Sequence, residues 1–289
     1  MTLTERLSQY EKLMRLDKPV GILLLLWPTL WGQWLASNGQ PSWLILWIFV
    51  MGVVLMRSAG CVINDYADRH IDPHVARTRE RPLAAGKVSP REALFLAAGL
   101  SLLAFLLILP LNRLVLMLSV IALFLAASYP YTKRFFAIPQ AYLGIAFGFG
   151  IPMSYAAIWD SIPSEAWVLL AANTFWAIAY DTQYAMVDRA DDLKIGIKTS
   201  AITFGRFDLA AIAVCYGITL GLLAWVGWQR GLGVAFYGGL AIAAAIALYH
   251  MLLIRTRDPQ QCFRAFLHNT WFGAAVFGGI ALSFVQRGL

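Results

Sequence analysis

Two short stretches concentrate acidic residues in a chain that has only 16 aspartates and glutamates among its 289 residues. The first, NDYADRHID, spans residues 64–72, and the second, DTQYAMVDRADD, spans residues 181–192. Clustered carboxylates repel one another unless cations neutralise them. Hard oxygen ligands favour Mg²⁺, which usually shares protein carboxylates with the phosphates of a substrate. The two stretches therefore predict a pair of Mg²⁺-binding clusters that serve a phosphorylated substrate.

The spacing in each stretch places the acidic side chains on one helix face. At about 100° per residue, the first stretch spreads its asparagine and three aspartates over about 100° before Pro73 ends the helix. The second stretch aligns three aspartates within about 40° and leaves Asp191 to one side. The candidate metal ligands are Asn64, Asp65, Asp68, Asp72, Asp181, Asp188 and Asp192. Solvated loop acids paired with Arg69 and Arg189 are the alternative interpretation, which explains one cluster better than two.

Basic residues accompany both clusters and can bind phosphate. Arginine forks and lysine charges suit a diphosphate that is also held by metal. The basic residues that follow a cluster or end a predicted span are Arg77, Arg79, Arg81, Lys133, Arg134, Lys194 and Lys198. Basic residues also mark the cytoplasmic side of membrane proteins, so a single one of them is weak evidence for a binding site.

The elements that must position these residues are membrane helices. Hydrophobic residues make up 60% of the chain, charged residues only 13%, and the mean hydropathy is +0.65. This composition indicates a polytopic, all-α membrane protein with a single domain over residues 1–289. Breaks at charged and Pro/Gly-rich stretches predict nine transmembrane helices, at residues 20–37, 43–63, 92–111, 114–130, 139–158, 165–183, 208–228, 231–254 and 266–286.

The distribution of charge orients the chain in the membrane. Most of the 23 lysines and arginines fall before the first span or after spans two, four, six and eight. By the positive-inside rule, these segments and both acidic clusters are expected on the cytoplasmic side of the membrane, and the C-terminus on the opposite side. The net charge of +7 then reflects topology rather than binding to nucleic acid.

The remaining sequence features predict no second site. Residues 1–19 carry apolar side chains on one helical face, which predicts an interfacial helix rather than a cleaved signal. The three cysteines are scattered and indicate neither a disulfide framework nor a zinc site. His250 and His268 are isolated in or near spans, where we expect packed residues rather than ligands.

Taken together, the motifs resemble a known family. NDYADRHID is similar to the NDxxDxxxD motif of the UbiA superfamily of intramembrane prenyltransferases. DTQYAMVDRADDLKIGIKTSAI resembles the second motif of its 4-hydroxybenzoate polyprenyltransferase branch, which serves ubiquinone biosynthesis. RTRERPLAAG, YPYTKRFFAIPQ and GFGIPMSYAA resemble the same branch, so the resemblance covers nearly the whole chain. The pair Thr199-Ser200 departs from the expected Ser-Thr order by one methyl group exchanged between neighbours.

The resemblance implies nine helices around a central cavity that opens laterally to lipid, with the active site near the cytoplasmic side. It implies Mg²⁺-dependent transfer of a polyprenyl group from polyprenyl diphosphate to the ring carbon ortho to the hydroxyl of 4-hydroxybenzoate. Within the metal site it implies catalytic roles for Asp68, Asp72 and Asp188. It also implies that Arg134 binds the acceptor, and it assigns diphosphate contacts to Arg77, Arg81, Lys133 and Lys198. No nucleic-acid partner and no obligate protein partner follow from it.

Two alternatives remain open. A UbiA-type enzyme can instead use homogentisate, a naphthoate or a porphyrin as its acceptor. A divalent-cation transporter would also need buried acids, but a transport path needs polar groups at the midplane and beyond, whereas these acids stop on one side. The sequence predicts neither the length of the prenyl chain, nor the oligomeric state, nor which aspartate binds which Mg²⁺.

Overall fold

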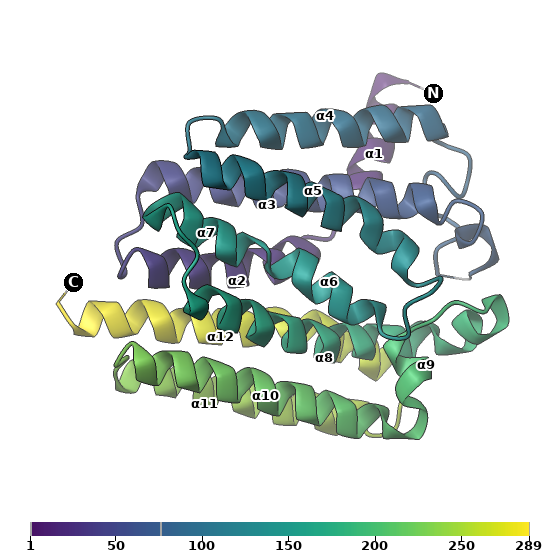
Figure 1. The fold of residues 1–289 in the computed structure, drawn as a ribbon. Helices are drawn as coiled ribbons and strands as arrows, with labels where there is room; N and C mark the ends of the chain where they lie inside the picture. Colours follow the sequence, from purple (N-terminus) through teal and green to yellow (C-terminus); the bar gives the residue numbers. More distant parts are fainter. Residues whose placement is uncertain (1, 76, 289) are drawn as a thin grey trace.

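The computed structural model describes residues 2–75 and 77–288, which contain helices and no strands. Most helices lie side by side with their axes roughly aligned, and the two ends of the chain lie at opposite ends of the bundle (Figure 1). The elements are α1 (Leu3–Met14), α2 (Val20–Ala36), α3 (Trp43–Ala67), η1 (Asp72–His74), α4 (Pro90–Ile108), α5 (Arg113–Thr132), α6 (Pro139–Gly148), α7 (Gly150–Trp159), α8 (Ser164–Ile195), α9 (Ser200–Phe204), η2 (Gly205–Phe207), α10 (Asp208–Gln229), α11 (Val234–Ile254) and α12 (Pro259–Gln286).

Each predicted span coincides with a helix or, for residues 139–158, with the consecutive helices α6 and α7. Seven of these elements are long and apolar enough to cross a membrane: α3, α4, α5, α6 with α7, α10 with the short helices before it, α11 and α12. Helix α2 is apolar but has 17 residues, and α8 carries polar residues such as Asn173 and Asp181 along its 32 residues. The structure therefore confirms an all-helical fold with multiple apolar spans.

Local sequence signals explain where several helices begin. Ser89 accepts a hydrogen bond from the backbone N–H of Glu92, whose side chain in turn accepts from the N–H of Ser89, and Pro90 occupies the first turn of α4. Asn112 caps α5 in a similar way through its side-chain oxygen. These caps place the first turn of each helix just before its apolar run.

The end of α3 differs from the prediction. We expected one helix to continue to Pro73, but α3 ends at Ala67, and Asp72 lies in the short helix η1. Pro73 disfavours the α conformation at Asp72, and a turn in which the N–H groups of Ile71 and Asp72 both donate to the Asp68 carbonyl replaces the last helical turn. Asp72 therefore reaches the cavity from a turn rather than from the helix face.

The predicted span 139–158 is divided at Phe149 into α6 and α7. The glycines on either side of the break lie close to neighbouring helices: a Cβ at Gly148 would collide with Asn173, and one at Gly150 would collide with Thr29. The lack of side chains at these two positions lets α8 and α2 approach the break.

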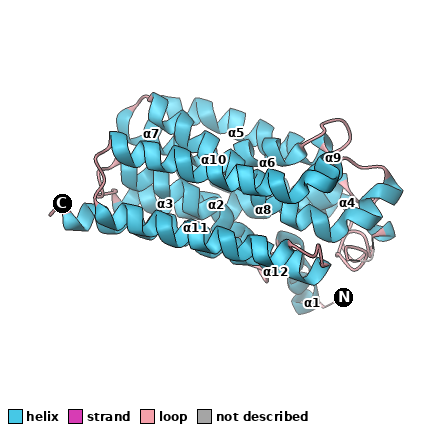
Figure 2. Ribbon diagram, turned by 90° about the horizontal axis from the view of Figure 1, so that it is seen from below, coloured by secondary structure: helices cyan, strands magenta, loops and turns pink. Residues whose placement is uncertain are grey.

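The packing surrounds α8 and leaves α4 and α5 at the periphery. The main hydrophobic core includes Trp31 of α2, Trp176 of α8 and Phe272 of α12. By contrast, α4 and α5 expose large apolar side chains such as Phe95 and Phe124, as lipid-facing helices do. Helix α1 lies across one end of the bundle (Figure 1, Figure 2). That end also carries the acidic clusters, and we call it the polar end.

Candidate active site

A cavity of about 1550 Å³ runs along α3 and is bordered by α2, α4 to α8 and α12. At the polar end it is lined by residues of both acidic stretches, and farther along by apolar side chains such as Ile48, Phe105 and Met153. Its lining on α3 extends from Ile48 to Asp65, which is about 25 Å at 1.5 Å per residue. The cavity thus joins an ionic end to a long apolar channel.

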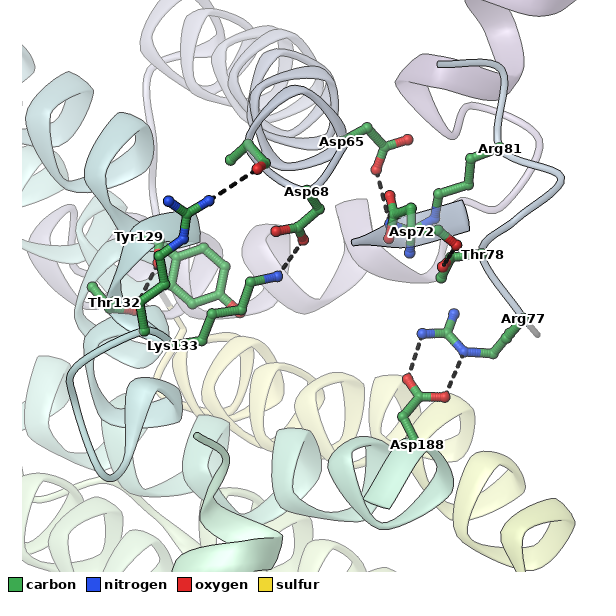
Figure 3. A network of polar contacts seen from close by, with 12 residues as sticks. Asp65, Asp68, Asp72, Arg77, Thr78, Arg81, Tyr129, Thr132, Lys133 and Asp188 are labelled. Atoms are coloured by element: carbon green, nitrogen blue, oxygen red, sulfur yellow. Dashed lines mark hydrogen bonds and ion pairs between the residues drawn. The ribbon is translucent and has the colours of Figure 1, made fainter. Parts of the chain in front are cut away.

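The acids of the first cluster pair with different basic residues (Figure 3). Arg81 Nη1 donates to Asp65 Oδ1 at 3.1 Å and to Asp72 Oδ2 at 2.9 Å. Asp68 faces another way and forms an ion pair with Lys133. The other carboxylate oxygen of Asp68, Oδ1, is buried, and no group in the described residues donates to it. An ideal helix would bring the side chains of this cluster together at one point. In the structure they do not converge, because Asp65 and Asp72 face Arg81 whereas Asp68 faces Lys133.

The second acidic cluster lies on α8 and faces the first across the cavity. Asp181, Asp188 and Asp192 all line the cavity, whereas Asp191 forms an ion pair with Lys194 at 3.2 Å. Arg77 donates to both carboxylate oxygens of Asp188, at 2.9 and 2.5 Å (Figure 3). The loop after α3 and helix α8 are thereby joined by a bidentate ion pair over the polar end of the cavity.

Burial raises the pKa of one carboxyl group in each cluster. Asp72 lies outside the membrane helices, and its burial raises its pKa above the ordinary value, although Arg81 opposes the shift. Asp192 lies beyond the predicted span 165–183, and burial and the neighbouring Asp188 raise its pKa to about 7. A cation bound beside either carboxylate would favour its ionised form.

The donor set fits a divalent cation that is shared with a substrate. Within residues 2–75 and 77–288, no three His, Cys, Asp or Glu side chains come close enough together to hold a metal by themselves. Mg²⁺ usually takes one or two carboxylates, with substrate phosphates and water as the other ligands, so a complete protein cage is not required. The unpartnered Asp68 Oδ1 and the nearby amide of Asn64, which also lines the cavity, are oxygen donors of the kind that Mg²⁺ prefers.

The basic residues singled out in the sequence separate into two groups. Those that line the cavity are Arg77, Arg81, Lys133 and Lys198. Arg79 and Lys194 are instead surface residues paired with neighbouring acids, Glu80 and Asp191. Arg134 donates from Nη2 to the Ala67 carbonyl at 3.1 Å and does not border the cavity in the described structure.

Two further arginines line the cavity and received no role from the sequence. Arg57 lies inside α3, two helical turns before Asn64, and its Nε is buried without a partner among the described residues. Arg15, at the end of α1, donates from Nη2 to Asp65 Oδ1 at 2.6 Å. An ionisable residue inside a membrane helix indicates function by default, so Arg57 could have been predicted as a site residue from its position within a span. Arg15 is revealed only by a contact across fifty positions of the chain.

Comparisons with known proteins agree with this architecture. Residues 25–278 match the UbiA prenyltransferase family. A protein of Thiobacillus denitrificans named 4-hydroxybenzoate octaprenyltransferase is 82% identical over 287 residues, which cover 99% of this chain and 98% of that protein. A protein of Azoarcus sp. with the same name is 68% identical, with 99% of both chains covered.

Solved structures show the same fold. A UbiA homolog from Aeropyrum pernix K1, in its apo form, matches with a TM-score of 0.79 and 27% identity over 93% of this chain and 98% of that one. A UbiA homolog from Archaeoglobus fulgidus bound to GPP and Mg²⁺ matches with a TM-score of 0.71 and 20% identity over 94% and 99%. From the family match over most of its length and from its highly identical relatives, the chain belongs to the UbiA prenyltransferase family.

Proposed function

We propose that this enzyme transfers a polyprenyl group from polyprenyl diphosphate to the ring carbon ortho to the hydroxyl of 4-hydroxybenzoate, for ubiquinone biosynthesis. The observation that carries the proposal is the cavity, which joins an ionic end to an apolar channel. A substrate with a diphosphate head and a hydrocarbon tail matches both parts. The choice of acceptor rests on relatives of up to 82% identity that are named 4-hydroxybenzoate octaprenyltransferase.

Mg²⁺ is the proposed cofactor, and when bound it supplies positive charge that stabilises the departing diphosphate. The oxygen donors that we assign to it are Asn64, Asp65, Asp68, Asp72, Asp181, Asp188 and Asp192. Asp68 is the strongest candidate because its Oδ1 is buried and unpartnered in the described part of the chain. Asp65 is the weakest, because its Oδ1 already accepts from two arginines.

Arg77, Arg81, Lys133 and Lys198 are proposed to hold the diphosphate. Lys133 and Lys198 are neighbours in space, since the backbone N–H of Lys198 donates to the Lys133 carbonyl at 2.8 Å. Without substrate, Arg77 binds Asp188 and Lys133 binds Asp68. Diphosphate oxygens compete for these same cationic groups, so substrate binding frees both carboxylates for the metal and for proton transfer.

The carboxylate of 4-hydroxybenzoate requires a cation inside the cavity. The family resemblance assigns this role to Arg134, whose guanidinium lies over the Tyr131 ring and donates to a backbone carbonyl. Arg57 instead lines the cavity and has an unpartnered, buried Nε among the described contacts. We therefore assign the acceptor carboxylate to Arg57 and treat Arg134 as the competing site.

The arrangement supports a sequence of steps that begins at the diphosphate. As the allylic C–O bond breaks, Arg77, Arg81 and Lys133 stabilise the negative charge that grows on the leaving group. The ring carbon ortho to the phenol attacks the allylic cation, and a base then removes the proton from that carbon. Asp188 is our candidate base, because its carboxylate lines the cavity and is released when the diphosphate binds Arg77. The apolar walls exclude water, which would otherwise hydrolyse the cation.

We further propose that all nine predicted spans cross a bacterial inner membrane, with the N-terminus cytoplasmic and the C-terminus periplasmic. The termini at opposite ends of the bundle support an odd number of crossings (Figure 1). The lateral opening to lipid is assigned to the gap between α4 and α5. Large apolar side chains of these two helices both line the cavity and are exposed, among them Leu102, Phe105, Val120 and Leu123. A prenyl tail longer than the cavity can pass between them into the bilayer.

Product analysis by mass spectrometry tests the proposed function. The protein purified in detergent is incubated with a polyprenyl diphosphate and a panel of acceptors, namely 4-hydroxybenzoate, homogentisate, a naphthoate and a porphyrin, with and without Mg²⁺. We expect prenylated 4-hydroxybenzoate that forms only with the metal. A product with another acceptor alone would change the assigned acceptor. Flux of divalent cations into liposomes without any transferase product would replace the enzyme by a transporter.

A further inference from the structure

Helix α1 reaches the active site from outside the bundle of long helices. It lies across the polar end, near the loop that follows α3 (Figure 1, Figure 2). Leu13 of α1 is fully buried and belongs to a small core with Val62 of α3 and Ala93 of α4. Near its start, Arg6 and Tyr10 both contact Glu92 of α4. Two separate contacts therefore fix α1 on the bundle.

The residue that ends α1 has an unusual backbone conformation. Arg15 is the C-cap of the helix with φ 56° and ψ 34°, and its N–H donates to the carbonyls of Glu11 and Lys12. Glycine or asparagine adopts this left-handed conformation easily, whereas a longer side chain adopts it at a cost in energy. Arginine is thus unfavourable for the backbone at this position, and strained residues of this kind are concentrated at functional sites, where the side chain has a role.

The side chain of Arg15 is held at the active site. Its Nη2 donates at 2.6 Å to Asp65 Oδ1, and Arg81 donates to the same oxygen at 3.1 Å. Asp65 is only 1% exposed. One buried carboxylate therefore places two guanidinium groups side by side, both on the lining of the cavity.

The other N–H groups of Arg15 are free for a ligand. A guanidinium has five N–H donors, and only Nη2 of Arg15 has a hydrogen-bond partner within the described residues. Arg15 and Arg77 both line the cavity, and like charges gathered there repel each other. An anion between the two guanidiniums would remove this repulsion and satisfy the remaining donors.

We propose that Arg15 binds the diphosphate group of the prenyl substrate, so that the interfacial helix α1 forms part of the active site. The inference rests on the proposed function, because that function supplies the diphosphate. Asp65, the weakest of the assigned metal ligands, then acts chiefly as a positioning residue that orients Arg15 and Arg81. Packing of Leu13 against Val62 of α3 and Ala93 of α4 holds the end of α1 on the bundle and brings the third guanidinium to the substrate head group.

The test compares three variants of the full-length protein in detergent. Arg15→Gly removes the guanidinium and also relieves the left-handed backbone, so a loss of binding is not explained by a strained fold. Arg15→Lys retains the charge without the fork. Arg6→Ala is the matched control, because it weakens the attachment of α1 to Glu92 at a site away from the cavity. Calorimetry with inorganic diphosphate and Mg²⁺ gives Kd, and steady-state kinetics give KM for each substrate.

We expect Arg15→Gly to raise Kd for diphosphate, and KM for the prenyl substrate, by about ten- to a hundredfold, as expected for the loss of a charge-assisted hydrogen bond. Arg15→Lys should recover part of the loss, and KM for 4-hydroxybenzoate and all constants of Arg6→Ala should stay within about twofold. Unchanged diphosphate affinity in Arg15→Gly would overturn the proposal. So would an equal loss for both substrates with a lower Tm, which indicates a structural anchor. Because calorimetry needs no acceptor, diphosphate binding is measured even if 4-hydroxybenzoate is not prenylated.

Discussion

The acidic clusters at the polar end and a second polar network inside the α8–α10–α12 core are both buried, but their hydrogen bonding differs. In the core network, Asn269 Oδ1 accepts from Trp176 Nε1 at 3.1 Å and from the Tyr216 hydroxyl at 2.8 Å. Asn269 Nδ2 donates to Gln183 Oε1 at 2.9 Å, and Gln183 Nε2 donates back to Tyr216 at 3.0 Å. No side-chain atom of this network is left without a partner in the described structure.

At the polar end the opposite holds, because Asp68 Oδ1 is unpartnered and Asp68 lines a cavity. Buried polar groups in native proteins are almost always paired, so an unpaired one facing a cavity indicates a ligand. A fully paired network has no capacity left for a ligand and instead fixes the helices that it joins. The comparison therefore separates residues that bind substrate from residues that hold the scaffold. Substitutions in the acidic clusters should lower activity at constant stability. Substitutions in the core network should lower stability and leave the activity of the folded protein unchanged.

Asp68→Ala should have the largest effect and tests the open cluster. Removal of this ligand leaves Mg²⁺ and the diphosphate poorly held, so turnover should fall by about a thousandfold. The Tm should stay within a few degrees, because the substitution also removes an acid from a repelling group. Turnover measured against Mg²⁺ concentration checks the change. Wild-type turnover at limiting Mg²⁺ would remove Asp68 from the metal site.

Asp188→Ala examines the second side of the same cavity. The substitution removes both the candidate base and the partner of Arg77. We expect most of the turnover to be lost, by at least about a hundredfold, while the protein remains folded. Single-turnover kinetics with saturating substrates separate the loss from a change in binding. Full activity in this variant would show that another group removes the ring proton.

Asn269→Ala should destabilise the protein and tests the closed network. The substitution leaves the N–H of Trp176 and the hydroxyl of Tyr216 without their acceptor, and each buried unsatisfied group costs about 1–3 kcal/mol. The total loss of about 3 kcal/mol should appear as a lower Tm in detergent. The turnover of the protein that is still folded should match the wild type. A selective loss of turnover at unchanged Tm would place the core network in the reaction.

Arg57→Ala, compared with Arg134→Ala, sharpens the assignment of the acceptor. Loss of the guanidinium that binds the carboxylate should raise KM for 4-hydroxybenzoate by about tenfold or more, with a much smaller change for the prenyl substrate. We expect this split in Arg57→Ala, because Arg57 has an unpartnered Nε among the described atoms. If the split occurs in Arg134→Ala alone, the role returns to the residue that the sequence favours.

The sequence was sufficient to predict where the helices lie and which aspartates of α8 share one face. Hydrophobic runs and charge asymmetry are local signals, and they placed each span on a helix or helix pair. Helical spacing likewise predicted that Asp181, Asp188 and Asp192 share a face, because all three lie on one unbroken helix, α8. The same reasoning failed for Asp72, where a turn before Pro73 replaces the expected helix.

Contacts between distant parts of the chain were beyond what spacing can predict. Arg15 meets Asp65 across fifty positions, and His250 meets His268 at 3.0 Å between α11 and α12. The description of these histidines as isolated was wrong. The proton of Tyr216 goes to Asn269, so His250 Nδ1 must donate to the Tyr216 oxygen at 2.9 Å. His250 Nε2 then accepts from His268, and the core network extends over four helices.

Tyr216→Phe should have the smallest effect and tests whether this extension matters. The variant keeps the ring and its packing against Phe272 but removes the hydroxyl that joins Gln183, Asn269 and His250. The hydroxyl accepts from Gln183 and His250 and donates to Asn269, so its removal leaves two N–H groups without an acceptor. Asn269→Ala instead leaves three groups of the network unpaired, namely the Trp176 N–H, the Tyr216 hydroxyl and Gln183 Oε1. The net destabilisation should therefore be about 1–2 kcal/mol, less than for Asn269→Ala. Thermal unfolding of both single variants and of the double variant gives their coupling, and a double variant no less stable than Asn269→Ala alone indicates one shared network. Strict additivity would mean that Tyr216 and Asn269 stabilise the core independently, so that the four helices are not joined by a single hydrogen-bonded unit.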